Sequence, residues 1–246
     1  MGTRTFVIAD IHGDLPALEA VLARLPKLAA KDTVVFLGDY VDRGPDPRGV
    51  VERVRRFVKE SKTKTVTLRG NHEDKWIQSV IKPDLPFLIQ WGNGCASTFR
   101  SFSGAPPLGP DETLDIPEIQ KMLDVAGWFP KDVAEWMETL PLWYEDEHAL
   151  YVHAGLESDG DGWKHPSQCA PKPLMWMREP RFYNGYRGKR LVFGHTPVAD
   201  LPIERGEAGP DDVFIDHDLI GLDTGCGKGG VLSAIELPSG TIYQSR

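Results

Sequence analysis

The stretch Gly38-Asp39-Tyr40-Val41-Asp42-Arg43-Gly44 comes directly after an apolar run, Thr33-Val34-Val35-Phe36-Leu37. A short apolar run of this kind is typical of a buried strand in a parallel sheet. Two carboxylates and an arginine therefore follow the carboxyl end of a strand, where open α/β sheets bind their ligands. Taken alone, the segment would also suit an ordinary turn with a surface ion pair, because short motifs match by chance. Similar segments elsewhere in the chain favour a site.

Two more predicted strands in the first 80 residues end in polar side chains. The strand over 5–9 is followed by Asp10-Ile11-His12-Gly13-Asp14, and the strand over 65–68 by Arg69-Gly70-Asn71-His72-Glu73. Apolar residues at helical spacing predict a helix after each strand, the first of them capped by Asp14. In an extended segment, Asp10 and His12 would point the same way. Parallel strands joined by right-handed crossovers would place all three strand ends side by side.

The segment from about 82 to 142 has a different character. Prolines interrupt its regular patterns, and an apolar stripe between Val133 and Leu140 suits one face of a helix that ends at Pro141. We expect a helical and loop insert that lies against the sheet, within a single domain spanning 1–246. Five tryptophans are expected mainly in the core, with substrate-facing positions as the alternative. They are Trp76, Trp91, Trp128, Trp136 and Trp143.

The C-terminal part of the chain repeats the pattern of strand ends. A strand over 149–152 ends in His153-Ala154-Gly155, and a strand over 191–193 ends in Gly194-His195-Thr196-Pro197. The remaining residues are rich in β-formers over 213–215, 221–223, 231–237 and 241–244. This pattern predicts a second sheet.

Composition and charge exclude several classes of protein. The chain has 246 residues, 41% of them hydrophobic, and a formal net charge of −8. An acidic surface disfavours a broad grip on nucleic acid or anionic lipid, although one phosphate could still bind in a locally positive pocket. The N-terminal apolar run over 6–9 is too short for a signal peptide or a membrane span. Three widely spaced cysteines form no disulfide framework, which favours a reducing, cytoplasmic location.

The strand-end residues together have the composition of a metal site. Two carboxylates, one amide and three imidazoles suit two divalent ions of the Mn, Fe or Zn type. No cysteine joins them, which disfavours a structural zinc site. The candidate ligands are Asp10, His12, Asp39, Asn71, His153 and His195, accompanied by Asp42, His72, Arg43, Arg69 and Arg178. His148, His165 and His217 belong to no such segment and are expected at the surface or in loops.

The ordered segments resemble the motifs of calcineurin-like metallophosphoesterases. They are Asp10-x-His12, Gly38-Asp39-x-x-Asp42-Arg43-Gly44, Gly70-Asn71-His72-Glu73, His153-Ala154-Gly155 and Gly194-His195-Thr196-Pro197. They are most similar to the phosphoprotein phosphatase family of Ser/Thr phosphatases in its compact bacterial and bacteriophage form. The resemblance implies an α/β (α+β) fold, a four-layer β-sandwich flanked by helices. It covers residues 5 to about 235.

The resemblance also implies roles for the matching positions. Asp10, His12 and Asp39 would hold one metal ion, and Asp39 would bridge to a second ion completed by Asn71, His153 and His195. A metal-activated water would attack phosphorus. His72, oriented by Asp42, would protonate the leaving alkoxide. Arg43, Arg178 and Asn71 would bind the substrate phosphate, and the two ions are expected to be Mn²⁺, with Fe or Zn as alternatives.

Three functions remain in competition at this stage. The first is a phosphomonoesterase acting on phosphoserine or phosphothreonine in a protein or peptide, and also on phosphotyrosine, without an obligate regulatory subunit. The second is a symmetrical diadenosine tetraphosphate hydrolase, which Asp42 and Glu73 disfavour because that branch generally carries Ala and Asp there. The third and lowest is a non-catalytic metal-binding scaffold. Pro197 disfavours a cyclic-nucleotide phosphodiesterase, whose motif is Gly-His-x-His.

Overall fold

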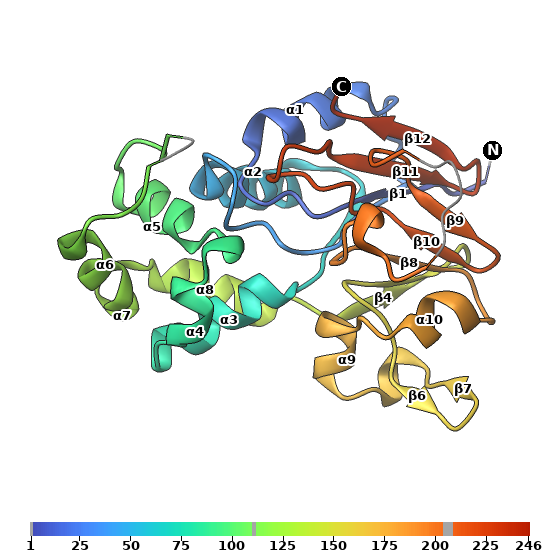
Figure 1. Ribbon diagram of the computed structural model, residues 1–246. Coiled ribbons are helices and arrows are strands. Elements are labelled where there is room, and N and C mark those ends of the chain that lie inside the picture. Colours follow the sequence, from blue (N-terminus) through green and yellow to red (C-terminus); the bar gives the residue numbers. More distant parts are fainter. Residues whose placement is uncertain (1, 110–111, 204–208) are drawn as a thin grey trace.

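The computed structural model describes residues 2–109, 112–203 and 209–246. The first sheet has the strand order β12-β11-β1-β2-β3 (Figure 1). Its strands are β1 (Thr5–Ile8), β2 (Thr33–Phe36), β3 (Lys64–Thr67), β11 (Ser233–Leu237) and β12 (Thr241–Gln244). The three N-terminal strands are parallel, with Ile8 opposite Phe36 and Phe36 opposite Thr67. Their carboxyl ends therefore lie side by side, as the sequence predicts.

A second five-stranded sheet is built from the C-terminal half, in the order β4-β5-β8-β10-β9. Its strands are β4 (Trp143–Glu145), β5 (Leu150–Val152), β8 (Leu191–Phe193), β9 (Phe214–Asp216) and β10 (Leu219–Gly221). Strands β5, β8 and β10 are parallel, so this sheet also gathers three carboxyl ends at one edge. A small hairpin, β6 (Ser158–Asp159) and β7 (Gly162–Trp163), stands apart. The predicted second sheet is thus confirmed.

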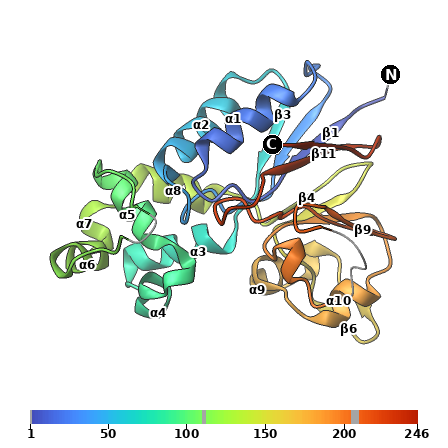
Figure 2. The same ribbon diagram turned by 45° about the horizontal axis from the view of Figure 1, so that its top comes forward.

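Helices flank the two sheets. Helices α1 (Leu15–Arg24) and α2 (Pro47–Glu60) lie beside the first sheet, and α9 (Pro171–Trp176) and α10 (Pro180–Gly185) beside the second (Figures 1 and 2). The predicted cap of α1 is present, since Asp14 accepts a hydrogen bond from the Ala17 N–H at 2.9 Å. Short 3-10 turns cover Pro166–Gln168 and Val198–Asp200. The result is the helix-flanked β-sandwich that the resemblance implies.

The insert is helical, but it does not lie mainly against a sheet as expected. After α3 (Asn71–Ile81) come α4 (Leu85–Ile89), η1 (Trp91–Asn93), α5 (Cys95–Ser103), α6 (Ile116–Leu123), α7 (Val125–Trp128) and α8 (Lys131–Thr139). Helix α5 packs on α2, and α8 packs on α3. The reason is that α1 and α2 already cover that side of the first sheet, so the insert meets helices instead (Figure 2).

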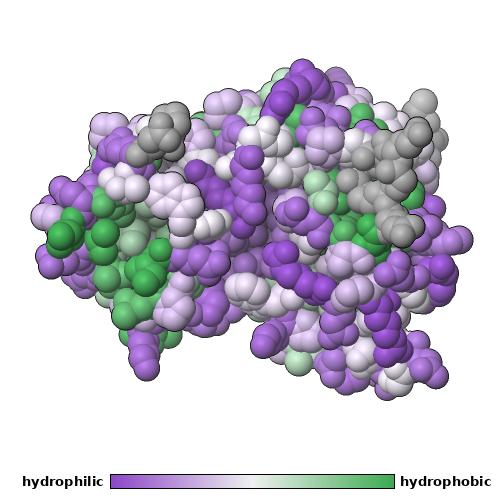
Figure 3. All heavy atoms as spheres, in the orientation of Figure 1, coloured by the Kyte–Doolittle hydropathy of each residue, from purple (hydrophilic) through white to green (hydrophobic). Residues whose placement is uncertain are grey.

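The tryptophans divide between core and surface. Trp76 is fully buried and stacks on Phe129 with ring centroids 5.2 Å apart, which confirms its core position. Trp91 is 71% exposed, so the core expectation is wrong for this residue. It lies in the short η1 turn, and no described helix or strand packs over its side chain. Figure 3 shows hydrophobic side chains gathered over the insert and hydrophilic side chains over the centre of the molecule.

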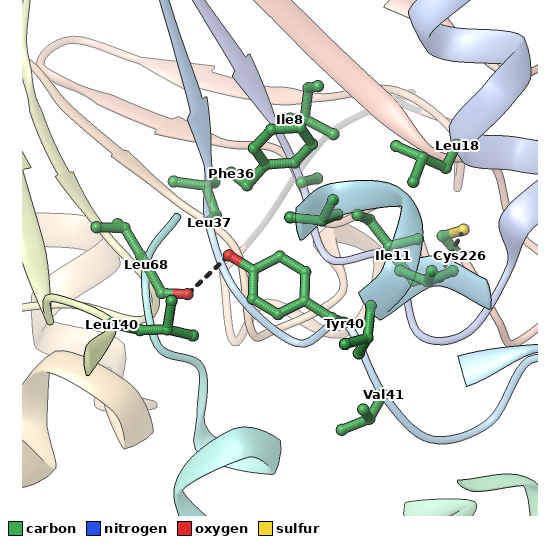
Figure 4. Close-up of a cluster of buried hydrophobic side chains, with 14 of the residues drawn as sticks. Ile8, Ile11, Leu18, Phe36, Leu37, Tyr40, Val41, Leu68, Leu140 and Cys226 are labelled. Carbon is green, nitrogen blue, oxygen red and sulfur yellow. Dashed lines mark hydrogen bonds between the residues drawn. The ribbon is translucent and has the colours of Figure 1, made fainter. Parts of the chain in front are cut away.

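Beneath the strand ends, the core holds the polar turns in place. Tyr40 is buried among Ile8, Phe36 and Leu37, and its hydroxyl donates to the Leu68 carbonyl at 2.8 Å (Figure 4). This bond ties the turn after β2 to the end of β3. None of the described helices is both long and apolar enough to cross a membrane.

Candidate metal centre

The candidate site lies where the carboxyl ends of the two sheets meet. Several of its residues sit in tight turns rather than in extended backbone. Positive φ angles occur at His12 (47°), Asp39 (52°), Asp42 (71°), Arg43 (68°) and His195 (66°). Such angles are uncommon outside glycine and store strain that concentrates at functional sites. The expectation that Asp10 and His12 share a side of an extended segment is therefore wrong, because the chain turns at His12.

Three candidate ligands from both sheets converge around Asn71. The Asn71 Oδ1 atom lies 2.9 Å from His153 Nε2 and 2.8 Å from His195 Nδ1. The Asp39 Oδ2 atom lies 3.5 Å from the same His153 Nε2. Potential ligand atoms of Asp39, His153 and His195 all lie within 4.8 Å of one another, and all three residues are buried. The sequence prediction that these strand ends meet is borne out by this arrangement.

A second group of ligand atoms shares Asp39. The Asp39 Oδ2 atom lies 3.4 Å from His12 Nε2, and a potential ligand atom of His72 lies within 4.8 Å of both residues. Burial opposes ionisation of Asp39, but the neighbouring His153, His72 and Arg43 outweigh it and lower the pKa of this carboxyl. Asp39 thus lies between the two groups, as a bridging ligand must.

The tautomers of the His153 and His12 imidazoles leave lone pairs that suit a bound cation. His153 Nδ1 faces the Leu37 carbonyl at 2.9 Å and must donate to it, and burial lowers the pKa of this imidazole. In the neutral ring, Nε2 therefore carries a lone pair that faces the Asn71 and Asp39 oxygens. His12 is held in the same way by the Val41 carbonyl at 3.0 Å. The Nε2 lone pair of His12 faces Asp39 and also the Arg43 guanidinium. At His153, acceptors converge with no proton between them, which is an arrangement that a divalent ion satisfies.

Two buried atoms of the candidate metal ligands make no hydrogen bond with any described residue. They are Asp10 Oδ1 and His195 Nε2. The other Asp10 oxygen accepts the His195 N–H at 2.8 Å, so Asp10 links the ends of β1 and β8. A Cβ atom on Gly194 would lie 2.0 Å from Asp10 Oδ1, which explains the glycine before His195. Asp10 belongs to neither three-residue ligand group, so its role as a ligand stays a prediction.

The predicted acid pair is formed. His72 Nδ1 donates to Asp42 Oδ2 at 2.5 Å. The other Asp42 oxygen accepts from Trp76 Nε1 at 2.9 Å and from the Thr98 hydroxyl at 2.5 Å. Because Asp42 is fixed by helices α3 and α5, it orients the imidazole so that Nε2 faces the ligand groups. This is the geometry that a proton donor requires.

The arginines behave differently from one another. The Arg43 guanidinium contacts His12 Nε2 and lies 3.3 Å from His72 Nε2, within the site. Arg178 Nη2 lies 3.4 Å from the His195 carbonyl, so the structure brings this residue to the site as well. Arg69 faces away, because it bonds the Glu138 carbonyl at 2.5 Å and pairs with Asp74 at 3.6 Å. Arg69 is therefore not among the residues gathered at the site.

Glu73 positions the turn that carries Asp39. Its carboxylate accepts the backbone N–H groups of Asp39 and Tyr40, both at 2.8 Å, and of Gly70 at 3.0 Å. Burial and the charge of Asp39 raise the pKa of Glu73 to about 8, against the effect of these donors.

We expect Glu73→Gln to lower the free energy of unfolding by about 1–3 kcal/mol, because an amide cannot accept all three N–H bonds and leaves buried donors unsatisfied. Urea denaturation measures this change. Glu52→Gln is the matched control, since Glu52 forms only an exposed i,i+4 pair with Arg48. Equal stability changes in the two variants would contradict the role of Glu73.

The structure adds a residue that the sequence prediction missed. Asp223 follows β10, beside β8, and its side chain is 2% exposed. One carboxylate oxygen accepts the Gly225 N–H at 2.9 Å, and the other has no partner among the described residues. Its charge is second only to burial among the causes that raise the pKa of Asp10. The sequence interpretation placed Asp223 inside a strand; recognising it as a strand terminus would have found it.

Comparisons with known proteins agree with this geometry. Residues 3–199 match the family model described as calcineurin-like phosphoesterase. A symmetrical bis(5'-nucleosyl)-tetraphosphatase from Nitrosospira multiformis is 27% identical over 98% of this chain and 94% of its own length. An asymmetrical bis(5'-nucleosyl)-tetraphosphatase from Anoxybacillus flavithermus is 26% identical over 94% of this chain and 89% of its own. The crystal structure of a provisionally assigned diadenosine tetraphosphatase, 23% identical, superposes with a TM-score of 0.67 over 98% of this chain and 92% of its own.

Proposed function

This chain belongs to the calcineurin-like phosphoesterase family, whose members are dinuclear metal-dependent hydrolases, and we propose that it hydrolyses dinucleoside tetraphosphates. The proposal concerns the substrate; a metal-dependent phosphoesterase is what the family match itself gives. Relatives that carry the tetraphosphatase name align over nearly the whole chain, which supports it. The first sequence interpretation, a protein phosphatase, becomes the second candidate.

The observation that carries the proposal is that two separate pockets lie beside the candidate site, one reaching it through Arg43 and the other through Trp176. One is a pocket of about 440 Å³ bordered by Arg43, Trp91 and Lys228. The other, of about 660 Å³, is bordered by Lys75, Lys172 and Trp176. The two pockets share no lining residue, and the ring of Trp176 lies 5.9 Å from that of His195. A phosphate chain with a nucleoside at each end needs two such flanking pockets, each with a cation and an aromatic surface.

The residues of the site suit attack at a phosphate. Divalent ions held by Asp10, His12, Asp39, Asn71, His153 and His195 would supply Lewis acidity and lower the pKa of a bound water. Arg43 offers a guanidinium fork that matches phosphate oxygens, and Arg178 adds a second positive charge near His195. His72, held by Asp42, is placed to give a proton to the departing oxygen.

The second candidate is hydrolysis of phosphoserine or phosphothreonine in a protein or peptide. The Asp42–His72 pair favours it, because a serine alkoxide leaves poorly and needs a proton donor. A nucleoside diphosphate is a much better leaving group and depends less on that donor. The two candidates therefore share the phosphate site and differ in what fills the flanking pockets.

We expect the chelator-stripped protein to regain hydrolysis of diadenosine tetraphosphate when Mn²⁺ is added. Products separated by anion exchange identify the cut: ADP alone for symmetrical cleavage, ATP with AMP for asymmetrical cleavage. A phosphoserine peptide, assayed in parallel at equal concentration, is the comparison substrate. Turnover of the peptide with an intact dinucleotide would overturn the proposal and establish the second candidate.

A further inference from the structure

The loop between β10 and β11 forms a wall of the site that no motif predicted. Within it, Gly227 has a φ of +75°, and a Cβ atom there would lie 2.7 Å from His12 Cβ and 3.3 Å from Arg43 Cβ. Arg246 holds the loop from outside, because its guanidinium donates to the Gly229 and Gly230 carbonyls at 2.5 and 2.9 Å. The loop is therefore seated against both a candidate ligand and the phosphate arginine.

Lys228 is the cation that this loop presents. Its side chain is solvent-accessible and lines the pocket that also contains Arg43. Desolvation and the nearby charge of Arg43 lower the pKa of Lys228, and Asp223 and Asp200 act in the opposite direction. No ion pair links its ammonium to a described residue. Neither Arg43 nor Lys228 forms an ion pair with a described carboxylate, although the buried Asp223 attracts both of them. Together the two cations make a locus for an anion with more than one charged group.

Trp91 borders the same pocket, and the backbone that follows it is anchored to Arg43. The Arg43 N–H donates to the Gly94 carbonyl at 3.1 Å, and the Ser97 hydroxyl donates to the Arg43 carbonyl at 2.9 Å. The turn that carries Trp91 is thus tied directly to the phosphate arginine. An exposed indole in the same pocket as Arg43 and Lys228 offers a flat face on which a nucleobase can stack.

The charge of the pocket also suits a nucleoside polyphosphate. Its lining contains one carboxylate, Glu112, which is paired with Arg100 at 2.9 Å. Arg43 and Lys228 are therefore the charges left to act on a ligand within a chain that is acidic overall. A basic peptide would be repelled here, whereas a nucleoside polyphosphate places its charges on the two cations and its base towards Trp91.

We propose that the pocket bordered by Arg43, Trp91 and Lys228 binds one nucleoside diphosphate arm of the substrate, with Lys228 on the phosphates and Trp91 on the base. This inference rests on the proposed function and names the residues that would select the substrate. Lys228 and Trp91 would select the substrate without taking part in metal binding or proton transfer, because neither belongs to the ligand groups or to the Asp42–His72 pair.

The test compares Lys228→Gln and Trp91→Ala with the Mn²⁺-loaded wild-type protein. We expect KM for diadenosine tetraphosphate to rise about tenfold in each variant, since one charged contact or one stacked base contributes roughly 1–3 kcal/mol. p-Nitrophenyl phosphate has no group to fill the pocket, so its KM should rise no more than about twofold in each variant. Trp91→Phe should recover most of the loss. Lys62→Gln, which removes an exposed lysine far from the site, is the charge control.

Binding of ADP provides a readout separate from turnover. ADP titrated into the Mn²⁺-loaded protein should bind less tightly to both variants, by calorimetry, and equally well to Lys62→Gln. If the wild type cleaves the dinucleotide but neither variant changes its KM or the affinity for ADP, the pocket assignment is wrong and the proposed function stands. If the wild type leaves the dinucleotide intact, the proposed function fails and this inference falls with it.

Discussion

Asp39→Asn is expected to remove both metal binding and activity, because Asp39 is the one carboxylate shared by the two ligand groups. Turnover should fall by roughly 1,000-fold or more, since several kcal/mol of charge stabilisation depend on the ions and each 1.4 kcal/mol is about tenfold in rate. Metal content per chain, measured by plasma mass spectrometry after dialysis, should fall from two ions to fewer than one.

The fold should survive this substitution. An asparagine Oδ1 can still accept the His72 N–H, which bonds Asp39 Oδ1 at 3.0 Å. The melting temperature of the metal-free variant should therefore stay near that of the metal-free wild type. Asp161→Asn, at a fully exposed position, is the control for loss of one negative charge. Retention of two ions by Asp39→Asn would contradict a bridging role.

His72→Asn is expected to separate substrates by their leaving groups. If His72 donates a proton, hydrolysis of an alkyl phosphate such as phosphoserine should slow by roughly 100- to 10,000-fold. Hydrolysis of p-nitrophenyl phosphate should slow much less, because a phenolate leaves without help, and a dinucleotide should fall between the two. Asp42→Asn should reproduce the pattern more weakly, since it leaves the imidazole in place and removes only its carboxylate partner.

Metal content distinguishes this role from a ligand role. A potential ligand atom of His72 also lies within 4.8 Å of those of His12 and Asp39, so the imidazole could in principle hold an ion. The account predicts two ions per chain in His72→Asn, as in wild type. Loss of an ion, or equal slowing of alkyl and aryl phosphates, would refute the proton-donor role.

The sequence predicted the frame of the site well, for a physical reason. Asp39, Asn71, His153 and His195 each follow an apolar strand, and parallel strands must end at a common edge. The four residues therefore meet because their strands run in the same direction. Apolar runs separated by crossover helices predict that direction from the sequence. The Asp42–His72 bond was reached only through the family resemblance, because it joins the turn after β2 to the first turn of helix α3.

Other features depend on packing that a single sequence does not display. The turn at His12 replaces an extended segment because Gly13 and Gly44 allow the two loops to approach closely. Trp91 looked like a core residue by type, yet its side chain is exposed and no described helix or strand covers it. Asp223 and Lys228 reach the site only because the loop after β10 packs on His12 and Arg43, at residues more than 170 positions away in the chain.

The most direct test of the account is a crystal of the Mn²⁺-soaked protein, with anomalous scattering measured above and below the manganese absorption edge. We predict two manganese peaks, both in contact with Asp39. One should lie beside His12 and Asp10, and the other beside Asn71, His153 and His195. A single peak, or peaks that do not touch Asp39, would contradict the dinuclear site on which the proposed hydrolysis depends.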